Sequence, residues 1–143
     1  MRSSDAIISI KPQFAEAILS RIKSVELRRR IPNTLRGTRL WIYATRPVGS
    51  VVGTALVTDI IRGAPDDIWS AYKNEVGISR DAFFAYYKDA NEAIALTLGN
   101  VQRRHPISID QLRKLWDGFH PPQVLAKLSA DDATKLEVMS RVA

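Results

Sequence analysis

The chain of 143 residues has no cysteine, only two histidines and no apolar run long enough to cross a membrane. The lack of cysteine excludes disulfides, thiolate metal sites and a cysteine nucleophile, and it is typical of the reducing cytoplasm. A membrane helix needs about 20 predominantly apolar residues. We therefore expect a cytoplasmic protein with no membrane partner, and the length favours a single domain over residues 1–143.

The signatures of common catalytic and cofactor sites are also missing. The sequence contains no glycine-rich phosphate loop, dinucleotide fingerprint or nucleophile elbow. His105 and His120 each precede a proline and stand apart, so neither belongs to a cluster with metal-ligand spacing. We therefore expect no metal site and no cofactor.

Positive charge, by contrast, is concentrated in the first third of the chain. Residues 1–46 hold ten Lys or Arg against three Asp or Glu, a net +7, whereas residues 47–143 hold eleven against twelve, a net −1. Clustered basic residues favour a phosphate-bearing partner, because neutralising phosphates releases condensed counterions. Solubility alone would also tolerate this charge, but the clustering indicates nucleic acid.

The most informative stretch is a charged strand expected over residues 24–30. Successive strand side chains face opposite ways, so Val25 and Leu27 would face a core. The other face carries Glu26, Arg28 and Arg30. Arginines two residues from a glutamate on one strand face can orient it and still have donors left for an anionic ligand.

Lys23 lies in the turn just before this strand. Its ammonium would act as a point charge over the polar face, or as a proton-transfer group if burial and nearby cations lower its pKa. The alternative is a solvated edge strand whose charges only protect it from aggregation.

The hydrophobic pattern predicts an α+β fold. Strands are expected near residues 6–10, 24–30, 39–44, 50–61, 93–106 and 124–128, and helices near residues 12–21, 65–75, 79–87 and 109–116 and from 129 onward. Gly53 inside a long strand predicts a β-bulge or a close backbone approach. The two helices between residues 65 and 87 carry six aromatic residues and read as an inserted pair that packs over the strands.

Trp41 and Tyr43 share one face of the strand at 39–44. Two aromatic rings so placed form either a second core layer or a platform on which a base stacks. Core packing is the commoner outcome.

Several motifs together resemble an ASCH (activating signal cointegrator homology) domain, a branch of the PUA-like superfamily. They are I-S-I-K-P at residues 8–12, K-S-V-E-L-R-R-R at 23–30, L-W-I-Y-A-T at 40–45, V-V-G at 51–53 and P-P-Q at 121–123. The resemblance implies a small, partly open β-barrel of about five to six strands, surrounded by helices and carrying a helical-pair insertion. It also implies a cleft lined by Lys11, Lys23, Glu26, Arg28 and Gln123.

The chain departs from the family pattern at three positions. Arg21 stands where the family has glycine, Ser24 where it has threonine, and Val124 where a serine often follows P-P-Q. In a branch that hydrolyses N4-acetylcytidine, the motif K-T-x-T supplies a threonine nucleophile. Glu26 occupies that slot here, and a carboxylate cannot serve as the same acyl acceptor, which argues against deacetylation of that kind.

Two functions from different classes fit these residues. As a binding module, the cleft would take single-stranded RNA or a flipped or modified nucleotide. Arg28 and Lys11 would hold phosphate, with Arg30 adding positive charge. Trp41 or Tyr43 would stack on the base, while Glu26 and Gln123 would bond its edge.

As a metal-independent ribonuclease, or more broadly a nucleoside-modifying hydrolase, the same cleft would use Lys23 with Tyr43 or Glu26 to move protons at the reacting phosphate. We favour binding, because it explains every residue in the set and requires no nucleophile. A domain serving only protein contacts is the third possibility.

Overall fold

The computed structural model describes residues 4–32 and 35–141. In chain order the elements are β1 (Ser4–Ile10), α1 (Pro12–Leu19), β2 (Val25–Arg28), β3 (Thr38–Ala44), β4 (Ser50–Gly63), α2 (Pro65–Tyr72), α3 (Arg80–Tyr86), β5 (Ala93–Ser108), α4 (Ile109–Leu115), β6 (Leu125–Leu128) and α5 (Ala130–Met139). Every predicted element occurs, with its ends shifted by a few residues. Within these ranges no helix has the length and apolarity that crossing a membrane requires.

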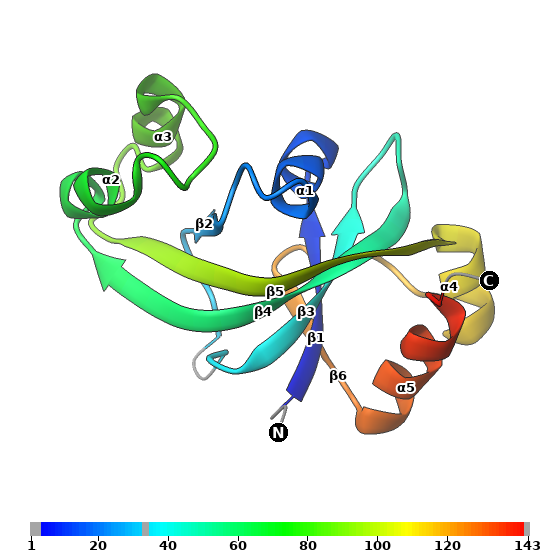
Figure 1. Cartoon of the computed structure of the whole chain (residues 1–143). Helices are drawn as coiled ribbons and strands as arrows, with labels where there is room; N and C mark the ends of the chain where they lie inside the picture. Colours follow the sequence, from blue (N-terminus) through cyan, green and yellow to red (C-terminus); the bar gives the residue numbers. More distant parts are fainter. Residues whose placement is uncertain (1–3, 33–34, 142–143) are drawn as a thin grey trace.

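The six strands form one mixed sheet in the order β2-β5-β4-β3-β1-β6, which confirms the α+β class (Figure 1). β1 and β3 run parallel, and the other neighbouring pairs are antiparallel. The predicted barrel is not closed: β2 and β6 are opposite edges, and no ladder joins them in the described part of the chain. Register shifts near Val51 and Gly53 confirm the predicted bulge in β4.

The two faces of the sheet are covered by different helices. Ile8, Ile18 and Ile42 belong to the core on the α1 face. Trp41 and Tyr43 belong to a second core, on the face that α4 and α5 cover. Because Trp41 is completely buried and Tyr43 is 3% exposed, these rings form a second core layer.

The aromatic helices α2 and α3 pack at the β2 end of the sheet (Figure 1). The ring centres of Trp69 and Phe83 are 5.1 Å apart, and those of Phe83 and Tyr87 are 5.0 Å apart. The same cluster contains Val25 and Leu27, the two β2 residues predicted to face a core. This apolar contact turns the polar face of β2 toward α1 and the 121–123 loop, where the cavity described below lies.

The turn between α1 and β2 is fixed by backbone hydrogen bonds at both ends. Arg21 adopts a left-handed φ of +63°, which ends the helix, and the amides of Ile22 and Lys23 both donate to the Ala17 carbonyl at 2.9 and 3.0 Å. The amides of Ser24 and Val25 then donate to the Glu75 carbonyl, at 2.9 and 3.1 Å. Lys23 is therefore held between α1 and the segment that follows α2.

Candidate functional site

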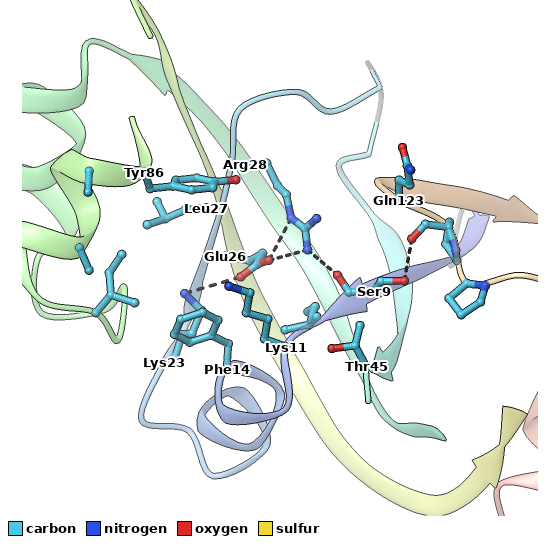
Figure 2. Close-up of a pocket in the computed structure, with 16 residues that line it drawn as sticks. Ser9, Lys11, Phe14, Lys23, Glu26, Leu27, Arg28, Thr45, Tyr86 and Gln123 are labelled. Carbon is cyan, nitrogen blue, oxygen red and sulfur yellow. Dashed lines mark hydrogen bonds and ion pairs between the residues drawn. The ribbon is translucent and has the colours of Figure 1, made fainter. Parts of the chain in front are cut away.

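A cavity of about 870 Å³ lies where β1, α1, β2 and α3 meet the 121–123 loop (Figure 2). Pockets that bind small molecules typically measure roughly 300–1,000 Å³, so this cavity has the volume of a small-molecule site. Its charged lining within the described ranges consists of Lys11, Lys23, Arg28 and Glu26. Three cations and one carboxylate give this lining a formal net charge of +2.

Lys23 forms part of the cavity floor and is only 3% exposed. Its Nζ donates to the Val76 carbonyl at 2.6 Å and lies 3.6 Å from Glu26 Oε1 and 5.5 Å from the centre of the Phe14 ring. Burial lowers the pKa of Lys23 below its ordinary value of 10.5, the Glu26 carboxylate opposes this shift, and Arg28 adds to it. Burial and the nearby Arg28 guanidinium thus make this ammonium more acidic than that of an exposed lysine.

Glu26 and Arg28 form an ion pair on one face of β2, as the alternation predicts, and both hydrogen bonds go to one carboxylate oxygen. Glu26 Oε2 accepts from Arg28 Nε at 2.9 Å and from Nη2 at 2.7 Å. The Nη2 group also donates to the Ser9 carbonyl at 2.9 Å, so Arg28 bridges two strands that are not neighbours in the sheet. Arg28 lines the cavity, and its Nη1 group makes no hydrogen bond to any described residue, so this group has donors left for a ligand.

The wall opposite β2 is tied to the sheet through Ser9. Its hydroxyl donates to the Pro122 carbonyl at 2.7 Å, which fixes the 121–123 loop on the end of β1. Gln123 follows in the same loop, is exposed and lines the cavity (Figure 2). A polar amide at the rim can bond the edge of a base.

Lys11 differs from Lys23 although both line the cavity. It is exposed and makes no ion pair within residues 4–32 and 35–141. Its backbone carbonyl accepts hydrogen bonds from the amides of Phe14 and Ala15, at 3.0 and 2.9 Å, and this anchors the residue at the start of α1. The site therefore combines a buried, bonded lysine with an exposed lysine whose ammonium is available.

Comparison with known proteins gives two matches that cover most of the chain. The family described as "Domain of unknown function (DUF365)" matches residues 6–111. A protein of Zymomonas mobilis subsp. mobilis named "ASCH domain-containing ribonuclease" is 42% identical over 132 residues, which are 92% of this chain and 89% of the relative. This chain belongs to the ASCH domain family.

Solved structures agree with this assignment. The crystal structure of ASCH from Zymomonas mobilis superposes on the ASCH domain described here with a TM-score of 0.93 and 40% identity, over 98% of this chain and 99% of that chain. Two further structures are variants of that protein, one with tyrosine changed to phenylalanine and one with serine changed to alanine. The N-terminal domain of Staphylothermus marinus McrB shares the fold alone, with a TM-score of 0.58 and 13% identity over 94% of this chain and 93% of that one.

The cavity of this ASCH domain brings together five of the residues singled out from the sequence, namely Lys11, Lys23, Glu26, Arg28 and Gln123. The other three lie elsewhere. Arg30 is exposed beyond the end of β2 and does not line the cavity.

Trp41 and Tyr43 lie on the opposite face of the sheet, against α4 and α5. Trp41 donates its indole N–H to Asp5 at 2.7 Å, and a ring without exposed surface cannot stack on a base, so that expectation for Trp41 is wrong. Burial raises the pKa of Tyr43, and the nearby Arg113 and Arg46 oppose the shift.

Two half-buried aromatic residues of the cavity were missed from the sequence, Phe14 in α1 and Tyr86 in α3. The Tyr86 ring stands beside Arg28 (Figure 2), and it also contacts the Arg29 guanidinium, 4.4 Å from the ring centre, and the Tyr87 ring, whose centre is 4.8 Å away. Burial raises the pKa of Tyr86. These two rings give the cavity apolar aromatic surface, which the buried Trp41 does not.

Metal ligands were not expected, and no group of three or more His, Cys, Asp or Glu side chains with metal-binding geometry was found among the residues that the structure describes. The cavity wall contributes a single carboxylate and otherwise lysine, arginine, hydroxyl and amide groups. This donor set suits an anion rather than a divalent cation.

Proposed function

We propose that this ASCH domain is a ribonuclease that binds single-stranded RNA, with one nucleotide and its phosphate in the cavity. The observation that carries the proposal is the excess of two positive charges around Glu26 in a cavity of nucleotide size. The 42% identity with a relative named as a ribonuclease moves our preference from binding alone to cleavage. A cysteine-free chain that acts on RNA fits the cytoplasm.

Phosphate binding falls to the two cations that have donors available. Lys11 is exposed and unpaired in the described ranges, and Arg28 has its Nη1 group left over after bonding Glu26 and Ser9. A lysine and an arginine on one phosphate are a common arrangement, because both supply charge-assisted hydrogen bonds. The base would then lie against Phe14 or Tyr86, with Gln123 at its edge.

Proton transfer falls to Lys23 and Glu26 on the cavity floor, 3.6 Å apart. In the reaction the 2′-oxygen attacks the adjacent phosphorus and the bond from phosphorus to the 5′-oxygen breaks. A cyclic 2′,3′-phosphate and a 5′-hydroxyl result. Glu26 would accept the proton of the 2′-hydroxyl, and Lys23, whose pKa burial lowers, would give a proton to the departing 5′-oxygen.

The test is cleavage of a fluorescent single-stranded RNA with excess chelator, beside an all-DNA strand of the same sequence. We expect RNA cleavage only, with cyclic phosphate ends. Lys23→Ala should lower the rate at saturating RNA by about 100-fold or more, whereas Arg28→Ala should mainly weaken binding. The matched controls Lys135→Ala and Arg62→Ala remove exposed cations outside the cavity and should leave both quantities unchanged.

Two results would contradict this assignment. Salt-dependent binding without turnover would leave a pure RNA reader. Loss of cleavage in a folded Tyr43→Phe variant, with Lys23→Ala fully active, would move the chemistry to the other face of the sheet. There the Tyr43 hydroxyl has Arg113 and Arg46 as its charged neighbours.

A further inference from the structure

A second basic surface lies next to the cavity. It is a shallow groove of about 710 Å³ between the end of α1, the middle of β5 and the residues after α5, and four arginines line it, Arg21, Arg103, Arg104 and Arg141. We call it the arginine groove. No acidic side chain is part of its lining in the described ranges.

The carboxylates near the groove neutralise only part of this charge. Arg103 forms a bidentate pair with Glu16 at 2.9 and 2.8 Å, but their side chains are 54% and 60% exposed. Exposed pairs of this kind contribute only about 0–1 kcal/mol, so a phosphate can replace the glutamate. Arg104 is committed to Glu137, while Arg141 is exposed and has no ion pair among the residues described.

Arg21 is held in the groove by its backbone and by its side chain. A φ of +63° is unfavourable for a residue with a Cβ atom and would suit glycine better. Its Nη2 group donates to the Val101 carbonyl at 3.0 Å, which directs the guanidinium over β5. The chain thus has an arginine at a position whose backbone conformation favours glycine, the residue without a side chain.

The groove and the cavity are lined by different residues of the same turn between α1 and β2. Arg21 lines the groove and Lys23 lines the cavity, and Cα atoms two residues apart are separated by at most about 7 Å. Ile22 between them is 71% exposed. A strand passing from one site to the other therefore crosses open surface.

We infer that a single RNA strand with one nucleotide in the cavity continues over this turn, and that the arginine groove binds its next phosphates. The inference rests on the proposed function and extends it to the path of the strand. Among the described residues the groove presents guanidinium groups but no aromatic ring, so it should recognise the phosphodiester backbone without regard to base sequence.

The test compares binding of a four-nucleotide and a sixteen-nucleotide 2′-O-methyl RNA, which cannot be cleaved through the 2′-oxygen. These lengths span the site sizes typical of single-strand binding domains. The double variant Arg21→Gly with Arg141→Ala removes two charges, and glycine accepts the φ of residue 21 without strain. The control variant Arg36→Ala with Arg62→Ala also removes two positive charges, from exposed positions outside the cavity and the arginine groove.

We expect the groove variant to bind the longer RNA about four- to 25-fold more weakly, at two- to five-fold for each arginine, and to lose selectivity for length. The slope of log affinity against log salt should fall by about 0.7 for each lost contact. Affinity for the longer RNA equal to that of the control would overturn the inference.

Arg28→Ala separates the two proposals. It should weaken binding of both lengths if the cavity holds a nucleotide. If it leaves both unchanged while the groove variant weakens the longer RNA, the cavity proposal fails and the groove stands as an RNA site. If the wild-type protein binds neither RNA, both proposals fall together.

Discussion

Replacing Glu26 by glutamine should show how much this one carboxylate contributes to the free energy of unfolding. The amide keeps the shape of the side chain but leaves Lys23, 3% exposed, and Arg28, 14% exposed, without their counter-charge. Removing one partner of a buried ion pair typically costs about 3–5 kcal/mol. Arg28 keeps its bond to the Ser9 carbonyl and borders an open cavity, so we expect about 3 kcal/mol, or roughly 10 °C in Tm for a domain of this size.

The assay is urea unfolding of both proteins at neutral pH, with and without inorganic phosphate. An anion that occupies the cavity replaces the missing charge, so phosphate should stabilise Glu26→Gln more than the wild type. Saturation at 100 times the dissociation constant contributes about 2.7 kcal/mol.

The free energy of unfolding should depend on pH because the pKa of Lys23 differs between the folded and the unfolded protein. Between its lowered pKa and 10.5 the unfolded chain binds more protons than the folded protein, so stability rises with pH in that window. Glu26 raises the pKa of Lys23, so in Glu26→Gln the window should open at a lower pH.

The matched control is Glu92→Gln, which removes the 52% exposed partner of Arg62 and should cost at most about 1 kcal/mol. If Glu26→Gln unfolds within that same range and gains nothing extra from phosphate, the carboxylate does not hold the cations together and our account of the cavity is wrong.

Three further changes test the surroundings of the cavity. Gly77 has a φ of +67°, and a Cβ there would lie 2.9 Å from Lys23 Cβ, so Gly77→Ala should cost about 2 kcal/mol in urea unfolding. Hydrogen bonds and charge from Arg104 and Arg39 lower the pKa of Glu137 from 4.5 to about 2. The contribution of Glu137 to stability is therefore complete above pH 4.5 and is lost as the pH falls toward 2. Glu137→Gln should make the free energy of unfolding depend less on pH in this range. Ser9→Ala removes the bond to the Pro122 carbonyl and should raise KM for RNA several-fold by loosening the 121–123 loop, with Tm lowered by about 3–4 °C.

The alternation over residues 24–30 was enough to predict the central pair of the site. Side chains two apart on a strand share a face, so the alternation alone placed Glu26 and Arg28 side by side. Val25 and Leu27 had to find apolar partners, and they did so on the aromatic helices. These statements depend on local geometry, which a sequence pattern carries well.

The aromatic residues that line the cavity could not be found in the same way. The pattern places Trp41 and Tyr43 on one face of β3, but whether that face is covered depends on where α4 and α5 pack, a long-range outcome. For the same reason six aromatic residues over two short helices give no indication that Tyr86 turns to the cavity while Phe83 is buried. Ring orientation was settled by tertiary packing, which local periodicity does not encode.

The two lysines of the cavity differ in burial, and under the proposed function this difference separates binding from chemistry. Lys23 donates to the Val76 carbonyl and pairs with Glu26, so its ammonium is fixed on the cavity floor. We therefore expect it to contribute little to the first binding of a ligand. Lys11 has no such partners within the described ranges and is exposed, so under the proposed function its ammonium is free to bind an arriving phosphate. Truncating Lys11 should therefore raise KM with kcat nearly kept, whereas truncating Lys23 should lower kcat with KM nearly kept. The same effect from both truncations would mean that the two ammonium groups act at one step, and the separation drawn from their burial would not hold.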